Sequence, residues 1–209
     1  MVKLTLLNPL SRLLIGLLSI TAVMFSSTAR ADDSWSRSYT LEAAGQYAAA
    51  ASSLESILKQ DSKHELALLR SGWLNYLAGN YSRAIDFYKS AQQVNRDSLE
   101  ARLGLTLPLL AQQRWREAAN EAEAVIKLSQ WNYYAHLRLM VAEEGLKEWQ
   151  TLKRHAAQLI QRYPTDASFR VYLARAEIQL GNSTAAKASY RKVLELIPGH
   201  LEASQYLAK

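Results

Sequence analysis

Histidine, cysteine and carboxylate side chains are the groups that could carry catalysis or hold a metal ion in this chain. The 209 residues include four histidines and no cysteine. His136 and His155 fall in different predicted helices, whereas His64 and His200 fall in predicted turns. The sequence has no HExxH pattern, no GxSxG motif and no glycine-rich phosphate loop. We therefore expect no catalytic residues, no metal site and no cofactor.

Three glutamates stand at positions that the predicted helices would partly bury, namely Glu143, Glu144 and Glu177. Basic residues that could neutralise them lie on neighbouring turns or helices, at Arg138, Arg170 and Arg175. Structural ion pairs, or side chains that remain solvated, account for such glutamates better than acid–base chemistry does. This pattern favours a binding or scaffold protein over an enzyme.

The elements that position these side chains repeat every 34 residues, five times, without insertion or deletion. The clearest copy carries Gly79, Tyr81, Ala84, Tyr88 and Ala91. The glycine suits a left-handed turn that ends one helix. The later positions place apolar groups on one face of a second helix. Each period is therefore a helix–turn–helix unit, and such units must stack to bury a continuous core.

This pattern resembles the tetratricopeptide repeat, and Pro164 and Pro198 stand where that family closes a repeat. The resemblance covers about residues 32–209. It implies an all-α, right-handed superhelical solenoid of about five repeats with a C-terminal capping helix. The expected repeats are about residues 32–64, 65–98, 99–132, 133–166 and 167–200, and the cap is residues 201–209.

The first helix of each repeat departs from the family pattern. The family's early bulky residue is replaced at Arg102, His136 and Arg170, and its later aromatic residue at Asn75, Glu143 and Glu177. We expect paired helices that are rotated from the family average. The first helix of the central repeat also contains Pro108, which predicts a kink. That kink would either shape a binding floor or be a local irregularity.

In this family the first helices line the concave surface, and one of their faces stays open to a partner. Here that face is largely apolar and aromatic, with arginine and tyrosine at its edges. We call it the groove, and its residues are Trp35, Tyr39, Leu69, Arg70, Trp73, Tyr76, Leu103, Leu107, Leu110, Tyr134, Arg138, Tyr172 and Arg175. An exposed stripe of this kind indicates a protein or peptide partner, with Arg138 or Arg175 pairing with a carboxylate. The alternative is that superhelical curvature, the cap or a second copy of the chain covers the groove.

Residues 1–31 have the features of a secretory signal peptide. Lys3 and Arg12 precede the uncharged apolar run 13–25, and Ala29-Arg30-Ala31 is a small-x-small cleavage site. The run is shorter than the roughly 20 residues of a transmembrane helix. We expect a cleaved signal and a periplasmic or secreted protein without a lipid-attached cysteine. The alternative is an uncleaved segment that anchors the chain in the membrane.

The charge balance gives little support to a nucleic-acid partner. The formal net charge is +6, and removal of residues 1–31 leaves 22 basic and 19 acidic residues, or +3.

We expect a non-catalytic exported adaptor that works in envelope assembly, secretion or polysaccharide export. One alternative is a carbohydrate or peptidoglycan binder that uses Trp35, Tyr39, Trp73 and Tyr76 as stacking platforms. Another is a structural repeat protein whose apolar face closes a homo-oligomer.

Overall fold

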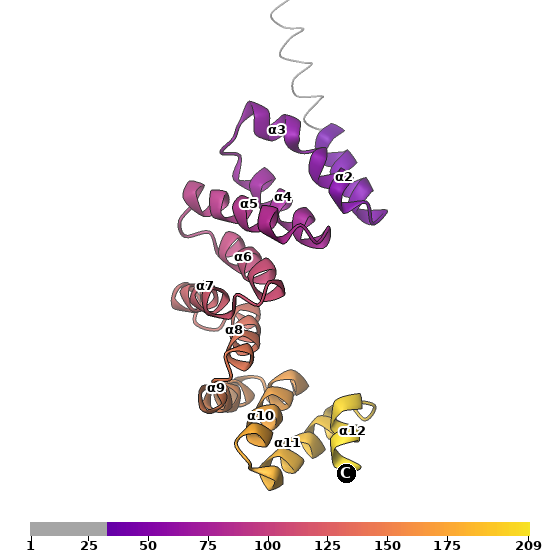
Figure 1. The fold of residues 1–209 in the computed structure, drawn as a ribbon, viewed down its shortest axis with the longest axis vertical. Coiled ribbons are helices and arrows are strands. Elements are labelled where there is room, and N and C mark those ends of the chain that lie inside the picture. The colour runs from indigo at the N-terminus through magenta and orange to yellow at the C-terminus, as the bar shows by residue number, and fades with distance from the viewer. Residues whose placement is uncertain (1–32) are drawn as a thin grey trace, which may run out of the picture.

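A computed structural model describes residues 33–209, and these residues form helices joined by short turns. The predicted signal peptide lies outside the described residues. Figure 1 shows the helices following one another along a single elongated, curved row. No helix among residues 33–209 is long and apolar enough to span a membrane. The predicted all-α repeat solenoid is confirmed for this part of the chain.

Residues 33–43 form the first described helix. The helices after it are α2 (Tyr47–Ser52), α3 (Glu55–Gln60), α4 (Glu65–Leu77), α5 (Tyr81–Val94), α6 (Leu99–Ala111), α7 (Trp115–Leu128), α8 (Tyr133–Gly145), α9 (Trp149–Arg162), α10 (Ala167–Gln179), α11 (Ser183–Leu196) and α12 (Leu201–Leu207). From α4 onward, the even-numbered helices open the repeats and the odd-numbered helices close them. The final helix, α12, occupies the place of the predicted cap and packs on α11.

The helices that open the repeats begin in the same way every 34 residues. A side chain at the N-cap accepts a backbone N–H of the first turn, and the residues in this position are His64, Ser98, Asn132, Asp166 and His200. In the third of these, Asn132 Oδ1 accepts from the Ala135 amide at 3.0 Å. Such caps typically stabilise a helix by about 1 kcal/mol each.

The turn inside each repeat is left-handed at one fixed position. Gly45, Gly79 and Gly181 have φ angles of 73°, 76° and 78° there. Gln113 and Lys147 occupy the same position with φ angles of 57° and 59°. A side chain in this region costs about 1–2 kcal/mol. The repeat geometry is therefore kept even where the sequence lacks the glycine.

The second helices carry the core, as the repeat pattern predicts. Their inward positions are almost fully buried, and in the last three repeats they are Ala118, Ala122, Val125, Leu152, Ala156, Leu159, Ala186, Tyr190 and Val193. Alanine at one or two of the three positions in each repeat lets neighbouring helices approach closely, and the larger side chains fill the space between them.

The first repeat departs from the expected helix–turn–helix unit, because its second helix is not continuous. There the helix is interrupted between α2 and α3. Ser53 Oγ donates to the Ala50 carbonyl at 2.7 Å, and the Leu54 amide donates to the Ala51 carbonyl at 3.1 Å. The hydroxyl thus takes the acceptor that a regular helix would offer to the Leu54 amide, and the turn tightens.

Candidate partner-binding groove

The structure sorts the groove residues by how much of each side chain solvent can reach. Three are exposed, namely Tyr39 at 55%, Trp73 at 37% and Tyr134 at 62%. Five more are half-buried: Tyr76, Leu103, Leu107, Arg138 and Arg175. Four are half-buried and pack against the hydrophobic core clusters, namely Trp35, Leu69, Leu110 and Tyr172. The remaining residue, Arg70, is buried.

At the N-terminal end of the groove, Arg70 joins α4 to the helix formed by residues 33–43. Its Nε donates to Ser38 Oγ at 2.9 Å, and its Nη2 lies 2.9 Å from Glu42 Oε2. The guanidinium also lies 3.5 Å from the ring centre of Tyr39. Trp73 adds a link between the same helices, because its indole N–H donates to Glu42 Oε1 at 2.7 Å. Arg70 is therefore a structural residue and does not offer a free cation to a partner.

At the centre of the groove, the helix α6 runs through Pro108 without ending. Proline has no amide hydrogen, so the carbonyl of Gly104, four residues earlier, loses its usual donor, and Leu103 is its neighbour. Arg138 of α8 reaches this region of α6. Its Nη1 donates to the Leu103 carbonyl and lies 3.2 Å from Thr106 Oγ1. The proline turn of α6 thus binds an arginine of the next repeat.

Arg138 is a half-buried cation with no carboxylate beside it. None of the ion pairs within residues 33–209 involves Arg138. Burial lowers the pKa of its guanidinium, and the phenols of Tyr88, Tyr76 and Tyr134 lie around it. The Tyr134 ring centre is 5.9 Å from the Arg138 guanidinium carbon. Burial also raises the pKa of Tyr88, so this phenol supplies no negative charge at neutral pH.

At the C-terminal end of the groove, Arg175 is already paired. Its Nε and Nη2 donate to the two carboxylate oxygens of Glu202 at 2.9 and 2.7 Å, and its Nη1 lies 3.1 Å from Glu144 Oε2. The hydrogen bonds to Glu202 raise the pKa of Arg175 and lower that of Glu202. This three-residue cluster ties the cap α12 to α10 and α8. We expected Arg138 or Arg175 to bind a carboxylate of the partner. Arg175 is already paired with carboxylates of this protein, whereas Arg138 is not.

The three partly buried glutamates all form structural pairs. Glu144 pairs with Arg175, as the sequence suggested. Glu177 instead pairs with Lys153, whose Nζ lies 3.0 Å from Glu177 Oε1. Glu143 pairs with His155 at 3.0 Å. In the described part of the chain, no group of histidine, aspartate and glutamate residues could hold a metal ion.

Sequence reasoning missed one cluster because it treated the histidines as scattered. His136 Nδ1 and His155 Nε2 lie 2.8 Å apart, between α8 and α9. A signal for this contact was present. His136 and His155 occupy the positions that Arg102 and Glu121 occupy one repeat earlier, and that pair is also in contact at 3.0 Å.

Two stretches of the chain, residues 37–98 and 169–200, match models of the tetratricopeptide repeat. Comparison with curated proteins finds no match. The matched stretches include the left-handed glycines Gly45, Gly79 and Gly181. Between the two stretches lie Gln113 and Lys147, where the glycine is replaced.

Several solved structures have the same fold. MamA of Desulfovibrio magneticus RS-1 gives a TM-score of 0.76 at 17% identity, over 82% of this chain and 97% of that chain. YrrB, a TPR protein with an unusual peptide-binding site, gives 0.75 at 14% identity, over 90% and 97%. A thermophilic TPR protein of Thermus thermophilus gives 0.61 at 20% identity, over 85% and 96%. Identities this low show the fold alone. Residues 37–98 and 169–200 therefore match the tetratricopeptide repeat, and residues 33–209 have the fold of a tetratricopeptide-repeat solenoid.

Proposed function

We propose that this protein is a non-catalytic adaptor that binds a segment of a partner protein in its groove. The observation that carries the proposal is Arg138, a half-buried cation without a carboxylate partner on an apolar and aromatic surface. A desolvated charge of this kind is costly when it is left uncompensated. A ligand carboxylate would compensate it and would gain a charge-assisted hydrogen bond worth about 1.5–3 kcal/mol.

The surroundings of Arg138 indicate which ligand segment fits best. The half-buried Leu103 and Leu107 on α6 offer apolar contacts, and the exposed Tyr134 stands at the edge of the groove. These neighbours favour an extended or helical segment that carries one acidic residue between apolar residues. The peptide-binding site of YrrB gives a precedent for such a ligand on this fold, without indicating its sequence.

We further propose that residues 1–31 export the protein, so that it meets its partner in the periplasm or outside the cell. The support is the sequence itself, which combines basic residues, an apolar run and a small-x-small site. An adaptor at that location would serve envelope assembly, secretion or polysaccharide export. An uncleaved N-terminal segment would keep the same adaptor at the membrane surface.

Two of the four aromatic rings that the carbohydrate alternative requires already contact other residues of the protein. Trp35 is half-buried against the hydrophobic core of the first repeat, and its ring centre lies 5.8 Å from that of His64. The Tyr39 ring carries the Arg70 guanidinium at 3.5 Å. Trp73 and Tyr76 remain, with ring centres 5.8 Å apart and planes tilted by 34°. A protein segment therefore accounts for more of the groove than a sugar does.

The test is crosslinking in intact cells followed by mass spectrometry, with wild type, Arg138→Met and Arg191→Met compared. Arg191 is exposed on α11 and serves as the matched loss of one positive charge. We expect wild type and Arg191→Met to recover the same envelope or secreted protein, and Arg138→Met to lose it. Equal recovery by all three folded proteins would contradict groove binding. A concentration-dependent mass in light scattering would favour the homo-oligomer.

A further inference from the structure

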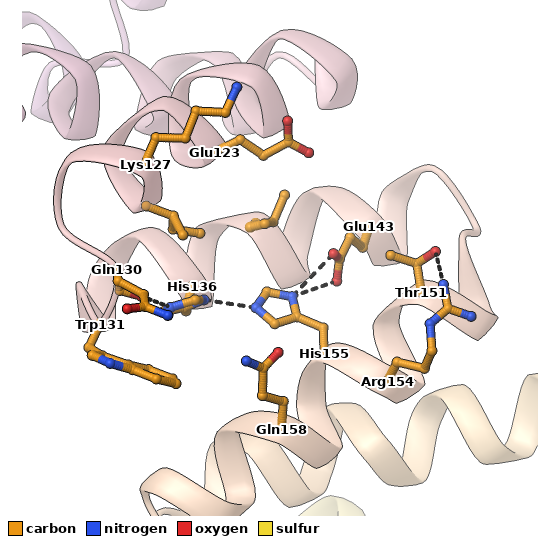
Figure 2. A pocket seen from close by; sticks show the side chains of 12 residues that line it. Glu123, Lys127, Gln130, Trp131, His136, Glu143, Thr151, Arg154, His155 and Gln158 are labelled. Atoms are coloured by element: carbon orange, nitrogen blue, oxygen red, sulfur yellow. Dashed lines mark hydrogen bonds and ion pairs between the residues drawn. The ribbon is translucent and has the colours of Figure 1, made fainter.

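A pocket of about 610 Å³ opens between α7 and α9, with α8 as its floor (Figure 2). We call it the wedge. Its lining residues are Glu123, Ile126, Lys127, Gln130, Trp131, His136, Leu139, Glu143, Thr151, Arg154, His155 and Gln158. The wedge is formed mainly by the helices that close the repeats, whereas the groove is formed by the helices that open them.

The corresponding places in earlier repeats are more nearly filled. Two repeats earlier, the pocket lined by Glu55, Asn75 and Phe87 has a volume of only about 80 Å³. One repeat earlier, Gln92 of α5 donates to Glu121 of α7 at 2.8 Å and so bridges the two closing helices directly. At the wedge, Ile126 and His155 take the places of Gln92 and Glu121. An isoleucine cannot make that hydrogen bond, so α7 and α9 lack this bridge.

Three contacts in series run along the wall of the wedge. The Gln130 carbonyl lies 2.8 Å from His136 Nε2, and His136 Nδ1 lies 2.8 Å from His155 Nε2. His155 Nδ1 lies 3.0 Å from Glu143 Oε2. Figure 2 shows His155 projecting from α9 toward His136 and Glu143 of α8. The side chains of His136 and Glu143 are only 6% and 5% exposed, so water does not readily replace these contacts.

Each contact in this series needs one proton between its two heavy atoms. Two neutral imidazoles carry two N–H protons, whereas the series has three contacts. The Gln130 carbonyl is an acceptor only, so His136 Nε2 must donate. His136 Nδ1 then accepts from His155 Nε2, and the third proton must lie between His155 Nδ1 and Glu143. The complete series is a neutral unit, such as an imidazolium beside a carboxylate.

Loss of the third proton leaves one of the three contacts without a proton, wherever the two remaining protons lie. If His155 keeps its Nε2 proton, the lone pair of Nδ1 faces the Glu143 carboxylate. If His155 keeps its Nδ1 proton, two nitrogen lone pairs face each other across the contact with His136. A tautomer change in His136 would move the mismatch to the Gln130 carbonyl. In the first two cases a buried contact between α8 and α9 becomes repulsive, and in the third the repulsive contact joins α8 to the turn before it.

We propose that this proton holds α8 and α9 together at the wedge, and that its loss near neutral pH widens the gap between α7 and α9. An imidazole has an ordinary pKa of about 6.5, which suits a change in this range. The other charged groups of the pocket are Glu123 and Lys127 on α7 and Arg154 on α9, whereas α10 contributes none. Burial lowers the pKa of His136.

A wider wedge would move the C-terminal repeats relative to the groove floor. Arg138 lies on α8, which forms the floor of the wedge, whereas Tyr172 lies on α10, which follows α9. The ion pair between Glu144 and Arg175 links α8 to α10 near the groove and would act as the pivot. The shape of the groove would then depend on pH.

The experiment measures the width of the wedge with spin labels on Asn120→Cys and Ala157→Cys. Both positions are exposed, and the chain has no natural cysteine. We expect the distance between the labels to increase as the pH rises from about 6 to 8. A second pair, on Asp86→Cys and Asn120→Cys, spans α5 and α7, where Gln92 and Glu121 are bridged. Its distance should not change.

Two variants decide whether the proton is responsible. In Glu143→Gln the carboxamide N–H can donate to His155 Nδ1, so the series is complete without an extra proton. This variant should stay closed at both pH values. The double variant His136→Leu with His155→Phe introduces the apolar pair that Leu68 and Phe87 form in the second repeat. The distance between its spin labels should also be independent of pH. An unchanged wild-type distance, or an equal change in folded Glu143→Gln, would overturn the proposal. The readout is a distance, so it is independent of partner binding.

Discussion

Gly104 of α6 packs directly against the ring of Tyr88 of α5, and a Cβ added to Gly104 would overlap that ring. Gly72 of α4 lies against the same ring, where a Cβ would come within 2.9 Å. Tyr88 is only 3% exposed, so the ring has little room to move away. The absence of a side chain at Gly104 therefore lets α4, α5 and α6 pack around one tyrosine.

The substitution Gly104→Ala should lower the free energy of unfolding. Overpacking of a filled core costs about 1–3 kcal/mol, which outweighs the higher helix propensity of alanine. The measurement is urea unfolding followed by circular dichroism. Gly199→Ala is the matched control, because a Cβ at Gly199 meets nothing within 4 Å. Equal stability of the two variants would show that Tyr88 can move at little cost.

The left-handed turns predict that glycine is also the more stable residue at position 147. Lys147→Gly should raise the thermal unfolding midpoint, because Lys147 has a φ of 59° and glycine removes the strain of its side chain. The expected gain is at most about 1 kcal/mol, since glycine also loses more entropy on folding. Gly79→Ala, at the equivalent position, should lose about as much. A lower midpoint for Lys147→Gly would mean that the lysine side chain makes a compensating contact.

The parts of the fold that the sequence predicted are those determined locally. The glycine at Gly79 and the small core residue Ala156 each act within one or two turns of their own helix, so the 34-residue pattern reveals them. The interruption at Ser53 was missed because a serine is compatible with a helix, and only its bond to the Ala50 carbonyl shows the break.

The candidate site was less predictable because it depends on contacts between repeats. Arg70 and Arg138 occupy the same place in the 34-residue repeat, and Arg175 lies three positions later in its own repeat. In the structure, Glu42 neutralises Arg70 and Glu202 neutralises Arg175, whereas Arg138 bonds only uncharged groups among the described residues. These partners lie on other helices, and their distances cannot be read from a helical pattern.

The cap predicts a specific pH dependence. Arg175 lowers the pKa of Glu202 below its ordinary value of 4.5, so this carboxylate adds stability that is complete above pH 4.5. The stability is lost as the pH falls through the lowered pKa. Glu202→Gln should therefore have a lower thermal midpoint than wild type at pH 7, and the two midpoints should converge at acid pH. Glu195→Gln, in an exposed pair with Lys192, should differ little from wild type at either pH. If the difference between the two thermal midpoints persists at low pH, packing and not the charge of Glu202 accounts for the effect.

The last prediction separates a binding role for Arg138 from a structural one. Arg138→Met keeps much of the apolar stem and removes a partly desolvated charge. The Leu103 carbonyl is not orphaned by this change, because Thr106 Oγ1 also donates to it, at 2.6 Å. We therefore expect the free energy of unfolding of Arg138→Met to be no lower than that of wild type, while its affinity for the partner falls at least about tenfold, or about 1.4 kcal/mol. Urea unfolding gives the first quantity, and titration with the recovered partner gives the second. A loss of stability above about 1 kcal/mol with unchanged affinity would make Arg138 a link between α6 and α8 and nothing more.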